Sequence, residues 1–122
     1  MAIRILIADD AVMMRAMLRD ILNENEDFEI VGEAANGVEV IEKYKELKPD
    51  LVTMDIVMPL KSGIEATREI RELDDNAKII MCSALGQESL VTEALEAGAL
   101  DFVVKPFQPE DVMEIVSKIV GG

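Results

Sequence analysis

Histidine is absent from this sequence and cysteine occurs once, which excludes several common kinds of chemistry. Without histidine, the chain cannot form a Ser-His or Cys-His catalytic pair, a histidine-ligated metal site or a phosphohistidine. The single Cys82 excludes an internal disulfide, and its place in an apolar run predicts a packed, unreactive side chain. Any chemistry must therefore come from carboxylates, lysine, hydroxyl groups and the backbone.

Aromatic residues and long apolar segments are also scarce. Only 3% of the 122 residues are aromatic although 50% are hydrophobic, so the core must consist mainly of aliphatic side chains and methionine. This composition suits a layered α/β architecture. No apolar run approaches the roughly 18 residues that span a bilayer, and the first residues lack the layout of a signal peptide. We expect a soluble cytoplasmic protein with one domain, residues 1–122.

Positive charge is in short supply, because 12 basic residues face 25 acidic ones and the net charge is −13. An excess of this size repels polyanions, so nucleic acid and anionic membranes are not expected to be direct partners. A basic partner or a bound cation is favoured instead.

Apolar runs alternate with segments of helical period, five of each, without a linker or repeat between them. This alternation is typical of βαβ units, in which helices cover both faces of a parallel sheet. The second strand is expected at an edge of the sheet because Glu29 interrupts it. The expected strands lie at residues 5–8, 28–31, 51–54, 79–82 and 102–104.

The helical segments carry apolar residues at spacings of three and four, which predicts one buried face on each helix. Asn36 is expected to cap the second helix with Glu39 reaching back, and Pro109 suits the first position of the last. Pro49 and Gly98 are expected to end the second and fourth helices. The residues expected to face inward are Met14, Met17, Leu18, Ile21, Leu22, Val40, Ile41, Tyr44, Leu47, Ala66, Ile70, Leu73, Leu90, Val91, Ala94, Leu95, Val112, Ile115, Val116 and Ile119.

Polar residues stand at the carboxyl ends of four of the expected strands. Right-handed crossovers between parallel strands give a doubly wound sheet, which binds ligands beyond these ends, where the strand order reverses. The topology therefore predicts that five residues lie close together: Asp9, Asp10, Asp55, Ser83 and Lys105.

The residue types in this group indicate a particular chemistry. Carboxylates without a cation nearby resist joint ionisation, and oxygen ligands without histidine or cysteine match Mg²⁺, which completes its shell with water and phosphate oxygens. Lys105 offers a point charge and Ser83 a hydroxyl donor for phosphate. The group predicts phosphoryl transfer onto Asp55, with Asp9 and Asp10 holding the metal.

Each of these residues also has an ordinary structural explanation. An Asp-Asp pair after a strand is commonly a helix cap, and Asp10 is a candidate cap for the helix that starts near Ala11. The joint occurrence of all five residues in this order favours the functional interpretation.

The motifs make the chain resemble the receiver domains of two-component response regulators over essentially its whole length. The resemblance implies a flavodoxin-like doubly wound sheet of five parallel strands, in the order 2-1-3-4-5, with five helices. The matching motifs are Asp9-Asp10, Asp55-Ile56-Val57-Met58-Pro59 with Gly63, Ser83-Ala84 and Lys105-Pro106-Phe107.

The same resemblance implies residue roles. A sensor histidine kinase would phosphorylate Asp55, with Ser83 and Lys105 completing the catalytic group. Mg²⁺ would be held by Asp10, Asp55 and the carbonyl of Val57, and by Asp9 mostly through a bound water. The peptide bond between Lys105 and Pro106 is usually cis in the family, and cis bonds are rare outside X-Pro pairs.

Residues 43–50, 81–87 and 101–109 resemble the chemotaxis members of this family more closely. They imply a CheA-like kinase upstream and a flagellar or archaellar motor or adaptor protein as target, with the regulator a monomer. The chain ends just after the last helix, so we expect a single-domain regulator. Other pathways stay open, namely sporulation, pilus motility, or a truncated transcription factor or methylesterase, because residues 25–33 look like receivers attached to such outputs.

The resemblance also implies how phosphate becomes a signal. Ser83 would move to bond the phosphoryl group, which lets Phe102 rotate inward and remodel the face made by the fourth helix, fifth strand and fifth helix. The alternative for Phe102 is ordinary strand packing.

Two functions of other classes share part of the pattern. A phosphatase that works through an aspartyl phosphate resembles a pattern with a second Asp two residues after the nucleophile, where this chain has Val57. A flavodoxin-type binder needs hydroxyls and amides after the first strand, where Asp9 and Asp10 would repel phosphate. We therefore predict a signalling protein and not an enzyme.

Overall fold

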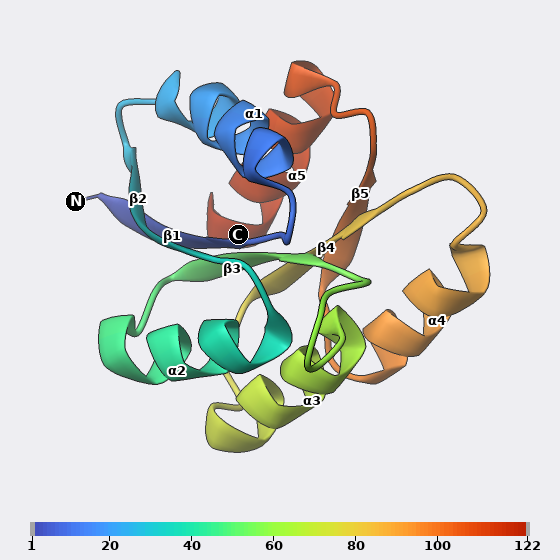
Figure 1. Ribbon diagram of the computed structural model, residues 1–122. Coiled ribbons are helices and arrows are strands. Elements are labelled where there is room, and N and C mark those ends of the chain that lie inside the picture. The colour runs from blue at the N-terminus through green and yellow to red at the C-terminus, as the bar shows by residue number, and fades with distance from the viewer. Residues whose placement is uncertain (1, 122) are drawn as a thin grey trace.

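The computed structural model describes residues 2–121, which form one parallel sheet between two layers of helices (Figure 1). The strands are β1 (Ile3–Ala8), β2 (Phe28–Ala34), β3 (Leu51–Asp55), β4 (Ile79–Ser83) and β5 (Asp101–Val104). The helices are α1 (Val12–Asn23), α2 (Gly37–Leu47), α3 (Gly63–Leu73), α4 (Glu88–Glu96) and α5 (Pro109–Gly121). The strand order is β2-β1-β3-β4-β5, which confirms the predicted topology.

The two faces of the sheet have separate hydrophobic cores. Helices α1 and α5 cover one face, and α2, α3 and α4 cover the other (Figure 1). Alternate strand residues enter opposite cores, so that Leu6 packs with α2 and α3 while Ile7 packs with α1 and α5. Strands β3 and β4 are buried along their whole length, as expected for central strands covered on both sides.

The ends of the helices follow the predicted signals. Asn36 Oδ1 accepts a hydrogen bond from the Glu39 N–H at 2.7 Å, and Glu39 reaches back to the N–H of Ala35. Pro109 begins α5, as predicted. Helix α2 ends at Leu47 and is followed by the left-handed Lys48 and by Pro49. Helix α4 ends at Glu96, two residues before Gly98, whose φ of +119° suits glycine.

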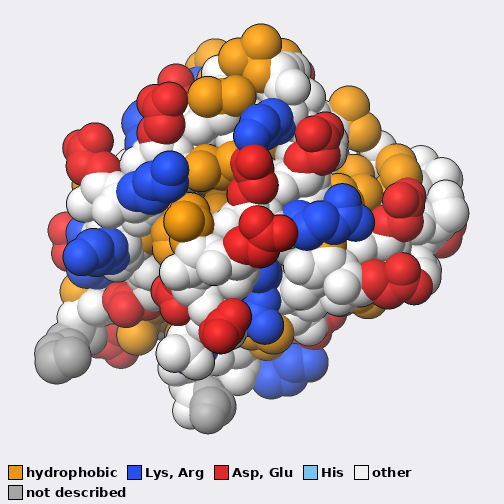
Figure 2. All heavy atoms as spheres, turned by 90° about the horizontal axis from the view of Figure 1, so that it is seen from below, with side chains coloured by type: hydrophobic (Ala, Val, Ile, Leu, Met, Phe, Trp, Pro, Cys, Tyr) orange, Lys and Arg blue, Asp and Glu red, His pale blue; other side chains and the backbone are white. Residues whose placement is uncertain are grey.

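Three side chains expected in the core are exposed, namely Met17, Leu73 and Leu95. Leu73 is the last residue of α3 and lines an open groove of about 500 Å³ between α2 and α3, together with Val38 and Ile41. Figure 2 shows this helical layer from below, with acidic and basic side chains interspersed over hydrophobic ones. Helical period identifies the inward face of a helix, but the width of the buried stripe depends on how closely neighbouring helices pack.

Strand β2 is longer than predicted, because it continues to Ala34 and does not stop at residue 31. Its pairing with β1 shifts register between Ile5 and Leu6, so an irregularity accommodates the extra residue. The predicted edge position of β2 is confirmed. The extension brings Glu33 and Ala34 beside the end of β1, where the acidic residues follow.

Candidate functional site

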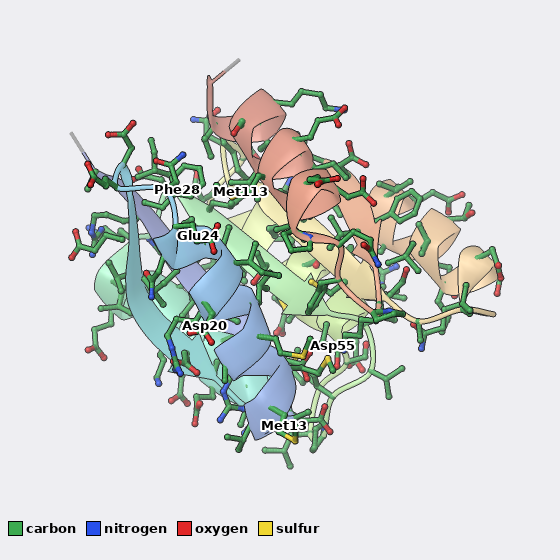
Figure 3. The ribbon with its side chains drawn as sticks, turned by 90° about the horizontal axis from the view of Figure 1, so that it is seen from above. Met13, Asp20, Glu24, Phe28, Asp55 and Met113 are labelled. Atoms are coloured by element: carbon green, nitrogen blue, oxygen red, sulfur yellow. The ribbon has the colours of Figure 1, made fainter. Side chains whose placement is uncertain are left out.

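The strand order reverses between β1 and β3, and the acidic residues lie at that point of the sheet. Asp55 ends β3, while Asp9 and Asp10 connect β1 to α1. Figure 3 labels Asp55 at the same end of the sheet as Met13, which is in the first turn of α1. The fold therefore places residues that are 45 positions apart in the sequence around one opening.

The three aspartates converge as predicted. Asp9, Asp10 and Asp55 each offer a carboxylate oxygen, and these oxygens lie within 4.8 Å of one another. Asp9 is 4% exposed and Asp55 7%, whereas Asp10 is exposed. Lys105 Nζ donates to Asp9 Oδ2 at 2.8 Å and to Asp55 Oδ1 at 3.1 Å. One ammonium group therefore serves two buried carboxylates.

The side chain of Asp9 stabilises the turn that leads into α1, but no side chain caps this helix. Asp9 Oδ1 accepts a hydrogen bond from the Ala11 N–H at 2.9 Å, and Ala11 is the N-cap residue of α1. No hydrogen bond to the Asp10 side chain is found among residues 2–121. The interpretation of Asp10 as a helix cap is therefore wrong, and its carboxylate is available to a ligand.

The loop after Asp55 is held tightly against the strand end. The Gly63 N–H donates to the Ile56 carbonyl at 2.7 Å, and a Cβ at position 63 would lie 1.9 Å from the Asp55 carbonyl oxygen. Only glycine allows this approach. The resulting turn leaves Val57 with an exposed side chain, and the role of its carbonyl as a metal ligand stays a prediction.

The electrostatics of the group reflect a surplus of negative charge. Burial and the nearby Asp9 raise the pKa of Asp55 to about 6, and Lys105 only partly opposes them. For Lys105, burial disfavours the ammonium, but the hydrogen bond to Asp9 and the charge of Asp55 outweigh burial and raise its pKa. The donors are oxygens, as Mg²⁺ prefers, and the residual charge is negative, so the residues present fit this ion.

Ser83 and Lys105 lie at the same site because Ser83 ends β4 and Lys105 follows the neighbouring strand β5. The Lys105 N–H donates to the Ser83 carbonyl at 2.7 Å, and Ser83 is buried at the end of β4. The bond between Lys105 and Pro106 is cis, as predicted. Ser83 and the partly exposed Phe102 line one cavity of about 280 Å³ with Val91 and Leu95. The five predicted residues thus meet at one edge, while their individual roles remain predictions.

Arg15 is a residue of this region that the sequence did not reveal. Its Nη1 donates to the main-chain carbonyl of Asp9 at 2.6 Å. The only signal available was its place four residues after Ala11 in the first helix, which does not indicate what its side chain contacts.

No helix of the described residues is both long and apolar enough to cross a bilayer.

Comparisons with known proteins agree with this geometry. The model of one family, the response regulator receiver domain, matches residues 5–117. Chemotaxis protein CheY of Thermotoga maritima is 59% identical over 116 residues, which are 95% of this chain and 96% of that protein. Chemotaxis protein CheY of Bacillus subtilis is 58% identical over 118 residues, which are 97% of this chain and 98% of that protein.

A solved structure is similar over nearly the same length. The complex of CheX and CheY with BeF3 and magnesium from Borrelia burgdorferi has a chain that is 42% identical with a TM-score of 0.89. The match covers 95% of this chain and 87% of that one.

Proposed function

Because the chain belongs to the family of response regulator receiver domains, we propose that Mg²⁺-dependent phosphorylation of Asp55 by a histidine kinase switches its binding to a target protein. The most similar proteins named above are chemotaxis regulators matched over nearly their whole length, so chemotaxis signalling is the pathway this protein serves. The observation that carries the proposal is the convergence of three carboxylates and Lys105 at the reversal point of the sheet.

Asp55 acts as the nucleophile. A carboxylate oxygen attacks the phosphorus of a phosphohistidine, the phosphorus–nitrogen bond breaks, and the imidazole leaves with the electron pair and takes up a proton. With a pKa of about 6, Asp55 is largely ionised at neutral pH and able to attack. Its burial excludes most solvent, so the donor must bring its phosphoryl group into the opening.

Lys105 and Ser83 bind oxygens of the phosphoryl group on Asp55. The ammonium of Lys105 already contacts Asp55 Oδ1 at 3.1 Å, so it is positioned to balance charge on an oxygen attached to that carboxylate. Ser83, at the end of the neighbouring strand β4, donates its hydroxyl to a second phosphoryl oxygen.

Asp10, Asp55 and the carbonyl of Val57 would hold Mg²⁺, with Asp9 acting mostly through a bound water. When bound, the ion supplies charge neutralisation for the carboxylates and the phosphoryl oxygens. The exposed and unengaged Asp10 favours this assignment, because it can turn toward an ion without giving up another contact.

The effect of phosphorylation reaches the target-binding face through the cavity that Ser83 and Phe102 line together. Movement of the Ser83 hydroxyl toward phosphate changes what Phe102 contacts, and the face of α4, β5 and α5 changes with it. An adjoining groove of about 530 Å³ combines Phe102 and Ile115 with Asp101, Asp111 and Glu114. This mixture of apolar and acidic side chains suits a target that presents apolar and basic residues, and we assign this role to a flagellar or archaellar motor or adaptor protein.

The partners and setting follow from the same proposal. A CheA-like kinase supplies the phosphoryl group, and the protein works as a monomer in the cytoplasm. Receiver domains are signalling proteins and not classical enzymes. We expect no catalytic turnover, because Val57 stands where aspartyl-phosphate phosphatases need a general acid.

The experiment is phosphorylation by acetyl phosphate with Mg²⁺, read by mass spectrometry of the intact protein. The native protein should gain the mass of one phosphoryl group, and Asp55→Asn should gain none. Asp75→Asn, an exposed aspartate away from the site, is the matched control and should behave as the native protein. Equal labelling of the Asp55 variant, or no labelling of the native protein, would contradict the proposal.

A panel of histidine kinases then identifies the phosphate donor. Capture of proteins with and without beryllofluoride, a mimic of the acyl phosphate, identifies the target. Capture of a motor or adaptor protein only with beryllofluoride is the expected result, and equal capture in both conditions would contradict a phosphate-controlled switch.

A further inference from the structure

Arg15 lies next to the acidic site but contacts none of its carboxylates. Its Nη1 donates to the main-chain carbonyl of Asp9 at 2.6 Å, and its Nε donates to Glu33 Oε1 at 3.0 Å. The side chain is only 16% exposed. Arg15 therefore joins the turn between β1 and α1 to the neighbouring edge strand.

Glu33 holds the Arg15 side chain in place and is itself held by two other residues. Its second oxygen accepts from Arg19 Nη1 at 2.7 Å, and its main-chain carbonyl accepts from Lys43 Nζ. Burial raises the pKa of Glu33, but the hydrogen bonds from Arg19 and Arg15 outweigh burial and lower it, so the carboxylate stays charged. Helix α1 packs against β1 and β2, as Figure 3 shows, and the two arginines link that helix to β2.

The carbonyl that Arg15 holds completes the restraint of Asp9. The Asp9 N–H donates to the Ala34 carbonyl at 3.0 Å, and its two carboxylate oxygens accept from Ala11 and Lys105. With Arg15 on the carbonyl, every polar group of Asp9 has a partner. The peptide unit is planar, so fixing this carbonyl also fixes the start of the next residue, Asp10.

Asp10 has no such restraint of its own. Its side chain is exposed and accepts no hydrogen bond from the residues described here, yet its carboxylate lies within reach of those of Asp9 and Asp55. The direction in which Asp10 projects therefore depends on the backbone before it.

We propose that Arg15, held by Glu33, is a positioning residue of the metal site, which aims Asp10 at the ion by holding the main-chain carbonyl of Asp9. The inference rests on the proposed function, since it assumes that these carboxylates bind Mg²⁺. It adds a residue that contacts neither the ion nor the phosphoryl group.

The direction of the change in Mg²⁺ affinity distinguishes a positioning role of Arg15 from a purely electrostatic one. Arg15 carries a positive charge near a cation site, so Coulomb's law alone predicts that removing it strengthens Mg²⁺ binding. Loss of positioning predicts the opposite, weaker binding. A decrease in affinity in a neutral variant therefore reports on geometry.

The test compares Mg²⁺ affinity by isothermal titration calorimetry at pH 7.5, well below the melting temperature of each variant. Arg15→Gln should weaken binding about tenfold, a typical effect for a residue that orients a metal ligand. Arg19→Gln is the matched control, because Arg19 shares Glu33 but does not contact Asp9; its affinity should stay within about twofold. Arg15→Lys retains a donor and the charge, and should recover part of the loss.

Native-like or tighter Mg²⁺ binding by a folded Arg15→Gln protein would overturn the inference. An equal loss in Arg15→Gln and Arg19→Gln would also overturn it, because the shared Glu33 contact would then explain both. If Arg15→Gln does not fold, Glu33→Gln releases the guanidinium from β2 and should weaken binding about threefold, and an unchanged affinity there would overturn the inference. Absence of Mg²⁺ binding by the native protein would refute the metal site itself, and the inference with it.

Discussion

Asp50 and Asp74, at the amino end of the sheet, are each matched by their own donors, whereas at the carboxyl end Asp9 and Asp55 share one lysine. Asp50 accepts from the Arg4 N–H at 2.8 Å and donates its own N–H to the Arg4 carbonyl. Asp74 accepts from the Tyr44 hydroxyl at 2.8 Å and from the Asn76 N–H at 2.9 Å. These two acidic groups are therefore satisfied within the protein.

The pKa values move in opposite directions at the two ends. Hydrogen bonds from Tyr44 and from the backbone of Asn76 lower the pKa of Asp74. Burial and Asp9 raise the pKa of Asp55 to about 6. The same sheet therefore has one end that stabilises its charges and one end that leaves a deficit of positive charge. A divalent cation bound by these carboxylates would relieve that deficit, and a stability deficit of this kind is common at functional sites.

Replacing Lys105 with methionine should give the largest stability change. It leaves two buried carboxylates without a cation, so the free energy of unfolding should fall by about 3 kcal/mol at pH 7.5 without Mg²⁺. The loss should shrink at pH 5, because Asp55 then takes up a proton. Denaturant titration measures both values. Lys118→Met is the control, since Lys118 also pairs with an aspartate but is 66% exposed against 18% for Lys105. Equal effects of the two variants would contradict the comparison.

Asp55→Asn should stabilise the metal-free protein. The folded-state pKa of about 6 exceeds the ordinary 3.8, so the folded protein holds this proton more tightly than the unfolded chain does. The stability linked to the protonated acid is fully present below pH 3.8 and is lost as the pH rises through 6. The variant should therefore gain roughly 2–3 kcal/mol at pH 7.5 and little at pH 4.

Denaturant titrations at several pH values check this dependence, with Asp50→Asn as the control from the other end of the sheet. Asp50→Asn should show no gain at any pH, because its carboxylate is already bonded to Arg4. A gain for Asp55→Asn that persists at pH 4 would exclude charge repulsion as its cause.

Mg²⁺ should stabilise the native protein by binding only the folded state. At ten times its dissociation constant, a ligand of this kind adds about 1.4 kcal/mol, which corresponds to a rise of about 5 °C in Tm. A thermal scan measures the shift. Asp10→Ala should remove it, because Asp10 is the carboxylate that is free to turn toward the ion. The same shift in that variant would place the ion elsewhere.

Tyr44→Phe tests the amino end and should have the smallest effect. Loss of the hydrogen bond to Asp74 should lower the free energy of unfolding by about 1 kcal/mol. The loss should be the same with and without Mg²⁺, because Tyr44 and the acidic site lie at opposite ends of the sheet. Denaturant titration in both conditions provides the measurement, and a loss that depends on Mg²⁺ would show that the two ends are coupled.

Much of the candidate site was predictable because parallel strands all end at one edge. Asp9, Asp55, Ser83 and Lys105 each follow an apolar run, and the alternation of runs and helices implies a parallel sheet. Residues at the ends of neighbouring strands lie close together whatever the details of side-chain packing. The strand order came from the family resemblance and is confirmed.

Other features depended on contacts between distant residues. The link from Arg15 to the carbonyl of Asp9 needs both the path of α1 and the length of β2, which carries Glu33. Leu73 and Leu95 follow the helical period but lie beside open grooves, so the pattern that predicts their side of the helix does not predict their exposure.

Residue types and their spacing were enough to indicate a parallel α/β sheet, a carboxylate site without histidine, and the residues that form it. Only the packed fold bonded the Asp9 carboxylate to the Ala11 N–H, left the Asp10 side chain without a donor among the described residues, and placed the Arg15 guanidinium on the Asp9 carbonyl. The physical reason is that side-chain period and strand ends are local properties of the chain. The direction of a carboxylate depends on backbone dihedrals and on partners that are brought together only when the sheet and helices pack.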